Sequence, residues 1–308
     1  MIRVEHLTKY YGTLLALDDV SFEVGKGEIV GLLGPNAAGK TTIMRILTGY
    51  LMPTKGDVWI AGRDVGRESL EARKRVGYLP ETIPLYADMS VRGYLKFVSR
   101  LRGVPRTRIP ARIEEVVGVC HLEDYADALI AKLSRGYRQR VGVAQAIVHD
   151  PDVLVLDEPT VGIDPRQVAM TRELIRELGN DRTILLSSHI LPEISMTCRR
   201  VIIIDRGRII AEDSIENLSA RMKGGKRLVL EIEGPSEAVG EVLRAIGGIR
   251  QVSSDGIRHL VDCAPDRDPR GLITEALLRN GWTLLGLSVE EMSLEDIFLR
   301  LTPEEPRV

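Results

Sequence analysis

The segment GPNAAGKT, Gly34 to Thr41, matches the pattern G-x-x-x-x-G-K-[ST] in full. A loop with little side-chain bulk lets successive backbone N–H groups point inward at phosphate oxygens, and the helix that follows adds its positive end. We expect Lys40 to reach the outer phosphates of a nucleotide and Thr41 to offer its hydroxyl to Mg²⁺. The candidate phosphate-binding residues are Gly34, Pro35, Asn36, Ala37, Ala38, Gly39, Lys40, Thr41 and Thr42.

Three further side chains follow two apolar, strand-like runs. VLVLDEP ends with Asp157 and Glu158, and ILLSSH ends with His189. Side chains alternate along a strand, so the two carboxylates are expected to point in different directions. We expect Asp157 to reach Mg²⁺ through its water shell and Glu158 to polarise the attacking water. The end of a parallel strand should lie beside the phosphates, where His189 would sense the γ-phosphate or orient the water.

The stretch KLSRGYRQR, residues 132–140, contains no carboxylate, which excludes an acid–base pair. Ser134 and Gly136 stand just before the helical pattern YRQRVGVAQAI. A hydroxyl, free backbone N–H groups and a helix N-terminus together make a second anion-binding surface. Two phosphate-binding surfaces and one γ-phosphate suggest that two chains share one nucleotide.

From residue 1 to about 215 the chain resembles the ATP-binding subunits of ABC transporters. GPNAAGKT, LSRGYRQR, VLVLDEPT, GIDP and SSH occur in that family's order and spacing. The resemblance implies an α/β P-loop NTPase with an inserted helical subdomain, ATP and Mg²⁺ as cofactors, and ATP hydrolysis. It implies a second ATPase subunit, expected to be a copy of this chain, whose signature segment closes on the ATP. It also implies that Tyr11 stacks on adenine, with Tyr10 as the competing candidate, and that Asp164 lies at the subunit interface.

A narrower resemblance concerns the exporter-type branch, which pairs with separate six-helix permeases for drugs, polysaccharides, lipids or gliding-motility components. It rests on VGYLPETIPLY, on the form KLSRGYRQR and on the ending SLEDIFLRLT. It implies an integral membrane permease as partner, met by the segment after Gly77–Glu81. It also implies a cytoplasmic subunit that is peripheral on the inner face of the cell membrane.

The sequence departs from the family pattern at several positions. The signature reads LSRGY, with Arg135 and Tyr137 in place of Gly and Gln. Glu81 stands where Gln is usual, and its carboxylate can still bind Mg²⁺. Ala37 replaces a frequent Gly, which costs roughly 1 kcal/mol if that position requires a positive φ. These changes bear on the hydrolysis rate more than on nucleotide binding.

The sequence predicts an ATPase domain over residues 1–220, a linker over 221–226 and an accessory domain over 227–308. A helical block, residues 88–149, interrupts the strand-rich frame of the first domain. The last part has the order βαββαβ of a small ferredoxin-like α+β sandwich, with an extra helix at SLEDIFLRL. Asp255-Gly256 between two alternating runs predicts a hairpin.

Composition limits the remaining functions. The 308 residues carry a net charge of −2, which gives no indication of a nucleic-acid partner. The longest apolar runs are strand-sized and far below the ~20 residues that span a bilayer. Two alternatives remain open: a soluble ABC-type ATPase that acts on ribosomes or DNA, and a nucleotide-gated module that hydrolyses little. In the second, the C-terminal domain is the regulatory part; otherwise it buttresses the ATPase dimer or the permease.

Overall fold

The computed structural model describes residues 1–217, 226–264 and 268–291. The chain divides into two compact units, Met1–Ile215 and Glu216–Val308. The predicted linker lies outside the described residues except for Lys226, which is the first residue of strand β11. The predicted helix SLEDIFLRL also lies outside the described residues.

The first unit is built on a six-stranded sheet with the order β10-β9-β3-β8-β7-β6. Its strands run parallel except for β10, which pairs antiparallel with β9. The short apolar runs of the sequence form its centre because both faces of the sheet are covered. The strands are β3 (Ile29–Leu33), β6 (Val76–Leu79), β7 (Val153–Leu156), β8 (Thr183–Ser188), β9 (Arg200–Asp205) and β10 (Arg208–Ser214).

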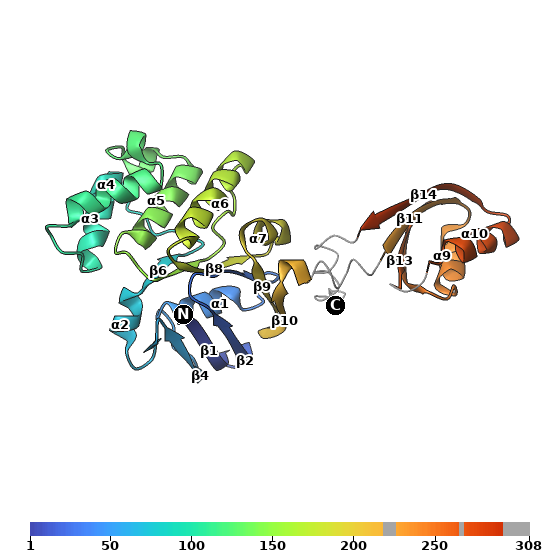
Figure 1. Ribbon diagram of the computed structural model, residues 1–308, viewed down its shortest axis with the longest axis horizontal. Coiled ribbons are helices and arrows are strands. Elements are labelled where there is room, and N and C mark those ends of the chain that lie inside the picture. Colours follow the sequence, from blue (N-terminus) through green and yellow to red (C-terminus); the bar gives the residue numbers. More distant parts are fainter. Residues whose placement is uncertain (218–225, 265–267, 292–308) are drawn as a thin grey trace. The chain divides into compact units, whose positions relative to one another are not determined.

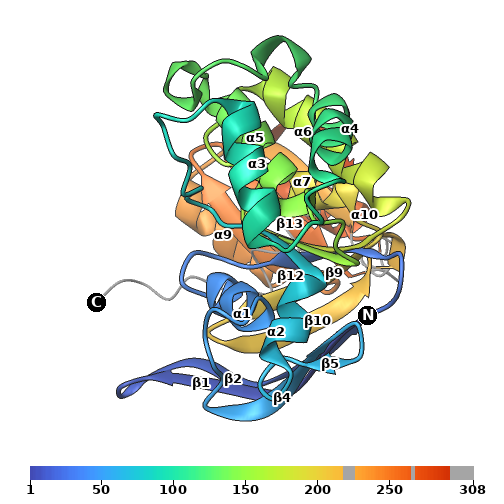
Figure 2. The ribbon, with the colours of Figure 1, turned by 90° about the vertical axis from the view of Figure 1, so that its left-hand side faces the viewer.

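Helix α1 (Lys40–Leu47) and a four-stranded sheet of order β2-β1-β4-β5 lie on one side of the parallel sheet (Figures 1 and 2). The buried face of α1, with Ile43, Met44, Ile46 and Leu47, joins the alternating apolar residues of this sheet in one core. That core fixes where α1 begins, and so where the phosphate loop ends. The strands are β1 (Ile2–Tyr11), β2 (Leu14–Val24), β4 (Lys55–Ile60) and β5 (Arg63–Asp64).

Helices α3 to α7 lie on the other side of the parallel sheet, whereas α2 lies beside α1 and contributes its buried Ala72 to the same core (Figures 1 and 2). Helices α3, α4 and α5 fall within the predicted helical block. Asp164 caps α6 by accepting hydrogen bonds from the backbone N–H groups of Arg166 and Gln167, both at 3.1 Å. The helices are α2 (Ser69–Lys74), α3 (Val91–Leu101), α4 (Ile109–Val119), α5 (Arg135–Ile147), α6 (Pro165–Gly179) and α7 (Leu191–Thr197).

The second unit is an antiparallel sheet of order β12-β13-β11-β14 packed against helices α9 and α10 (Figure 1). This strand order confirms the predicted ferredoxin-like arrangement, and the hairpin turns at Asp255 and Gly256 as expected. Its core joins strand residues such as Leu228 and Val261 to helix residues such as Leu243 and Ile273. The elements are β11 (Lys226–Glu233), α9 (Ser236–Arg244), β12 (Ile249–Asp255), β13 (Arg258–Cys263), α10 (Arg270–Arg279) and β14 (Thr283–Glu291).

Candidate functional site

A cavity of about 570 Å³ lies at the carboxyl end of the parallel strands. It collects residues from strands β1 and β2, from the loop between β3 and α1, and from the segments after β6, β7 and β8. Tyr11 lines it and Tyr10 does not, although the two are equally exposed, so the geometry favours Tyr11 for the adenine. The lining residues are Tyr11, Leu14, Ala16, Pro35, Asn36, Ala37, Ala38, Gly39, Lys40, Thr41, Thr42, Glu81, Glu158, Val161 and His189.

The shape of the phosphate loop depends on residues without bulk. Gly39 has a φ of 110°, and a Cβ there would lie 2.7 Å from Cδ2 of Leu17. At Gly34 a Cβ would lie 2.4 Å from the carbonyl oxygen of Ile204. Ala37 has a φ of 65°, which is the positive value considered in the sequence analysis. An alanine in this conformation reduces stability by roughly 1 kcal/mol.

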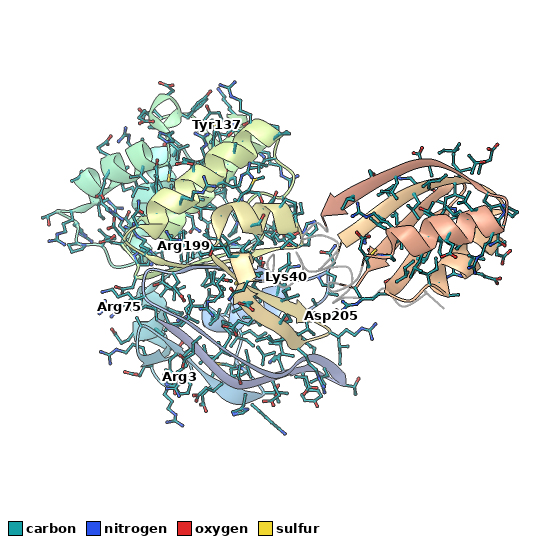
Figure 3. The ribbon with its side chains drawn as sticks, turned by 45° about the vertical axis from the view of Figure 1, so that its right-hand side comes forward. Arg3, Lys40, Arg75, Tyr137, Arg199 and Asp205 are labelled. Carbon is teal, nitrogen blue, oxygen red and sulfur yellow. The ribbon has the colours of Figure 1, made fainter. Side chains whose placement is uncertain are left out.

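Lys40 lies in the interior of the first unit, with a side chain that is 6 % exposed (Figure 3). Its Nζ donates to the carbonyl oxygen of Gly34 at 2.7 Å and lies 3.3 Å from Oε1 of Glu158, which is itself 7 % exposed. Oε2 of Glu158 lies 3.0 Å from Nδ1 of His189. Lysine, carboxylate and imidazole therefore form one connected row, which no residue pattern had indicated.

The direction of the Glu158 side chain was expected to follow from strand alternation, but it has a different cause. Strand β7 ends at Leu156, so strand alternation does not apply to the two carboxylates. Glu158 has a φ of 49°, in the left-handed region that non-glycine residues rarely adopt. A turn, and not the pleat of a strand, therefore aims this side chain at Lys40 and His189. Such strained backbone is enriched at active sites and ligand-binding segments.

Asp157 is buried, and its Oδ1 accepts a hydrogen bond of 2.6 Å from the Ser187 hydroxyl. The same hydroxyl oxygen accepts the backbone N–H of Glu158 at 2.9 Å. Burial raises the pKa of Asp157, while the hydroxyls of Ser187 and Thr41 act in the opposite direction. Ser187 thus links both carboxylate-bearing residues. Ser187 was not among the predicted site residues, although its place next to Ser188 in the SSH motif could have indicated it.

The residues expected to hold Mg²⁺ fit that ion. Thr41, Glu81 and Asp157 together line a hollow of about 400 Å³ beside the phosphate loop. Oδ2 of Asp157 is buried without a hydrogen-bond partner among the described residues. The charge of Glu81 contributes to the raised pKa of Asp157. Hard oxygen donors with one buried, unused oxygen suit a divalent cation such as Mg²⁺.

The signature residues do not join this cavity. Ser134, Arg135, Gly136 and Asp164 are absent from its lining, at the starts of α5 and α6. Figure 3 shows Tyr137, in the first turn of α5, well apart from Lys40. The Ser134 hydroxyl caps α5 by accepting from the backbone N–H of Tyr137 at 3.4 Å. Within one chain, the signature residues therefore lie outside the cavity that contains the phosphate loop.

Replacement of Ser187 by alanine should affect stability and catalysis together. Two buried groups, the Asp157 carboxylate and the Glu158 N–H, would lose their partner, at about 1–3 kcal/mol for the buried groups left unpaired. We expect urea denaturation to show this loss, and ATP hydrolysis to slow about tenfold through misplacement of Glu158. Ser195→Ala is the matched control, because among the described residues that hydroxyl donates only to the carbonyl oxygen of Pro192 in its own helix. Equal values for both variants would contradict this role of Ser187.

Comparison with known proteins agrees with this geometry. A family model described as ABC transporter matches residues 17–161. Among curated proteins, the chain is 31% identical to the linearmycin resistance ATP-binding protein LnrL of Bacillus subtilis (strain 168), over 98% of both chains. It is 36% identical to the Nod factor export ATP-binding protein I of Paraburkholderia xenovorans (strain LB400), over 99% of this chain and 97% of that protein.

Solved structures show the same fold. An ATP-binding subunit of an ABC transporter is 28% identical, with a TM-score of 0.65 over 72% of this chain and 92% of that chain. The cbiO1 structure from Clostridium perfringens, part of an ABC transporter complex, is 27% identical with a TM-score of 0.65, over 71% and 90% of the two chains. In the part of the chain that the structure describes, no helix is long and apolar enough to cross a membrane. From its similarity to these curated proteins and solved structures, the chain belongs to the ATP-binding proteins of ABC transporters, and it is an ATPase with the P-loop fold.

Proposed function

We propose that this chain powers export through a separate membrane permease, and that two copies of it enclose two ATP molecules between them. One observation carries the proposal. The cavity around Lys40 contains the phosphate loop, Glu158 and His189, but none of the signature residues. A γ-phosphate in this cavity therefore meets the second anion-binding surface only if another chain supplies it. The relative named for Nod factor export supports export as the task.

The proposed nucleotide contacts follow from this arrangement. The loop from Gly34 to Thr42 binds the phosphates and Tyr11 stacks on the adenine of the same chain. Ser134, Arg135 and Gly136 of the second chain contact the γ-phosphate from the opposite side. Asp164 lies at the interface between the chains, where its exposed position at the start of α6 is compatible with such a contact.

The ion pair between Lys40 and Glu158 suggests how binding prepares hydrolysis. A γ-phosphate offers Lys40 a more highly charged partner than Glu158 does. Transfer of Lys40 to the phosphate frees Oε1 of Glu158 to accept a proton from the attacking water. His189, 3.0 Å from Oε2, holds the carboxylate in place. Mg²⁺, held by Thr41, Asp157 and Glu81, would supply positive charge at the phosphate oxygens. The chemistry is mainly positioning and charge stabilisation.

The surface beside Glu81 is the proposed contact with the permease. Glu81 lines the nucleotide cavity and also the adjoining hollow that holds Tyr50, Tyr78 and Arg102. A permease segment seated there would be in contact with a residue of the nucleotide site. Through this contact the subunit would be peripheral to the cell membrane, on its inner, cytoplasmic face. The proposed function includes no nucleic-acid partner.

Glu158→Gln is expected to retain ATP binding and to lower turnover by ~10²–10⁴, the range for loss of a general base. The amide cannot accept the proton, but it keeps the shape of the site, so ATP-dependent dimers should accumulate. Hydrolysis assays and size measurements with and without ATP check both points. The control is Glu177→Gln on the exposed side of α6, which should behave as the unmodified chain. Unchanged turnover in Glu158→Gln would exclude Glu158 as the base.

A weakly hydrolysing, nucleotide-gated module remains the second candidate. One observation favours this second candidate. Ala37 has a strained φ of 65°, and it belongs to the loop that binds the phosphates. The same assay decides between the two candidates. An unmodified chain that binds ATP, forms the dimer and does not hydrolyse ATP would support the second candidate.

The domain boundaries and the role of the C-terminal part are also proposals. We assign residues 1–220 to the ATPase domain, 221–226 to a linker and 227–308 to a domain that buttresses the ATPase dimer or the permease. A chain that ends at Gly224 keeps the whole cavity around Lys40, so it should bind ATP normally. Its ATP-dependent dimer, or its complex with the permease, should be weaker. Unchanged hydrolysis, dimerisation and permease binding would argue against any such role.

A further inference from the structure

The arginine that distinguishes this signature segment lies on the turn that follows the catalytic carboxylate. A Cβ built on Gly162 would lie 2.3 Å from Cζ of Arg135 and 2.4 Å from both terminal guanidinium nitrogens. The guanidinium of Arg135 therefore occupies the space that a Cβ of residue 162 would need. Any side chain at residue 162 would displace it, and the φ of 72° at this residue also favours glycine.

Further contacts join the same two segments of the first unit. Nε2 of Gln139 donates to the carbonyl oxygen of Pro159 at 2.7 Å in a buried position. A Cβ on Gly136 would lie 2.8 Å from Cγ of Gln167, so the start of α5 rests directly on α6. Arg140 donates to Oε1 of Gln167 at 3.2 Å. Contacts of Arg135, Gly136, Gln139 and Arg140 therefore fix the N-terminal part of α5 to residues 159–167.

The turn that Arg135 touches is short and leads directly to Glu158. The backbone N–H of Val161 donates to the carbonyl oxygen of Glu158 at 3.3 Å, just before Gly162. The strained φ of 49° at Glu158 lies at the other end of this turn. A shift of Gly162 therefore changes the backbone that aims the Glu158 carboxylate, because only three residues separate the two.

Arg135 also has a free side. Its side chain is exposed, and no carboxylate forms an ion pair with it among the residues that the structure describes. Together with Glu81 it lines a hollow of about 280 Å³ at the base of α5. One face of the guanidinium is thus packed on its own chain, and its charge is not neutralised by an ion pair.

We propose that Arg135 is a positioning residue within its own chain, which ties the segment that grips the second chain's nucleotide to the turn that carries Glu158. This inference rests on the proposed sharing of nucleotides between two chains. When Ser134 and Gly136 close on the second chain's γ-phosphate, Arg135 moves with them and presses on Gly162. Occupation of one nucleotide site is thereby transmitted to the catalytic carboxylate of the other.

Mixed dimers separate this role from direct contact with the nucleotide. The reference dimer pairs one unmodified chain with one Glu158→Gln chain, purified through two different tags, so that hydrolysis comes from a single Glu158. In the first arrangement, Arg135→Ala is placed on the chain that keeps Glu158. In the second, it is placed on the Glu158→Gln chain, whose signature segment faces the active nucleotide.

The proposal predicts that the first arrangement lowers kcat about tenfold, because the remaining Glu158 has lost its own support. The second arrangement should raise the ATP concentration needed for half-maximal rate and leave kcat near that of the reference. Gly162→Ala in the first arrangement should reproduce the loss. Combined with Arg135→Ala it should add nothing further, because both changes remove one contact.

Arg138→Ala is the matched control. Arg138 lies on the same helix, but it donates to the carbonyl oxygens of Ile130 and Ala131 and not toward Gly162. It should leave both arrangements at the reference rate. A first arrangement that hydrolyses ATP as the reference does, or equal losses of kcat in both arrangements, would overturn the proposal. A reference dimer that fails to form or to hydrolyse ATP would instead overturn the proposed function, and this inference with it.

Discussion

Lys40 and Glu158 meet at 3.3 Å in a place that is almost closed to water, and much of the first unit serves to bring them there. A buried ion pair adds little net stability, but one of its charges left alone is strongly unfavourable. The pair therefore balances the charges of Lys40 and Glu158 and leaves the lysine responsive to a new anion. A nucleotide phosphate that takes Lys40 away from Glu158 satisfies the lysine and exposes the base in the same step.

The geometry around this pair depends on groups that carry no chemistry themselves. Gly34 and Gly39 allow the loop to approach Ile204 and Leu17, and Ser187 holds Asp157 and Glu158 from the neighbouring strand. Because β3, β7 and β8 are parallel neighbours, their following segments meet at one edge of the sheet. The signature segment belongs to another element, and contacts with residues 159–167 connect it to the same site.

The fold and the loop residues could be predicted from the sequence because local patterns determine them. Short apolar runs gave the parallel strands, helical spacing gave α3 to α5, and G-x-x-x-x-G-K-[ST] has one local conformation that suits phosphate. Asp164 and Ser134 were recognised from motifs, but their hydrogen bonds as helix caps were not foreseen. The row from Lys40 through Glu158 to His189 joins three segments that are far apart in the sequence, so no local pattern contains it. The positive φ of Glu158 and the contact of Arg135 with Gly162 depend on tertiary packing for the same reason.

The central claim is that one nucleotide is shared between two chains, and mixing two inactive variants tests it most directly. Lys40→Ala removes the phosphate lysine, and Ser134→Arg blocks the signature segment. If sites are shared, the mixed dimer contains one complete site, built from Lys40 of one chain and Ser134 of the other. The account predicts that neither variant alone hydrolyses ATP and that the mixture recovers a clear fraction of the unmodified rate. A mixture that forms dimers but remains as inactive as its components would contradict it.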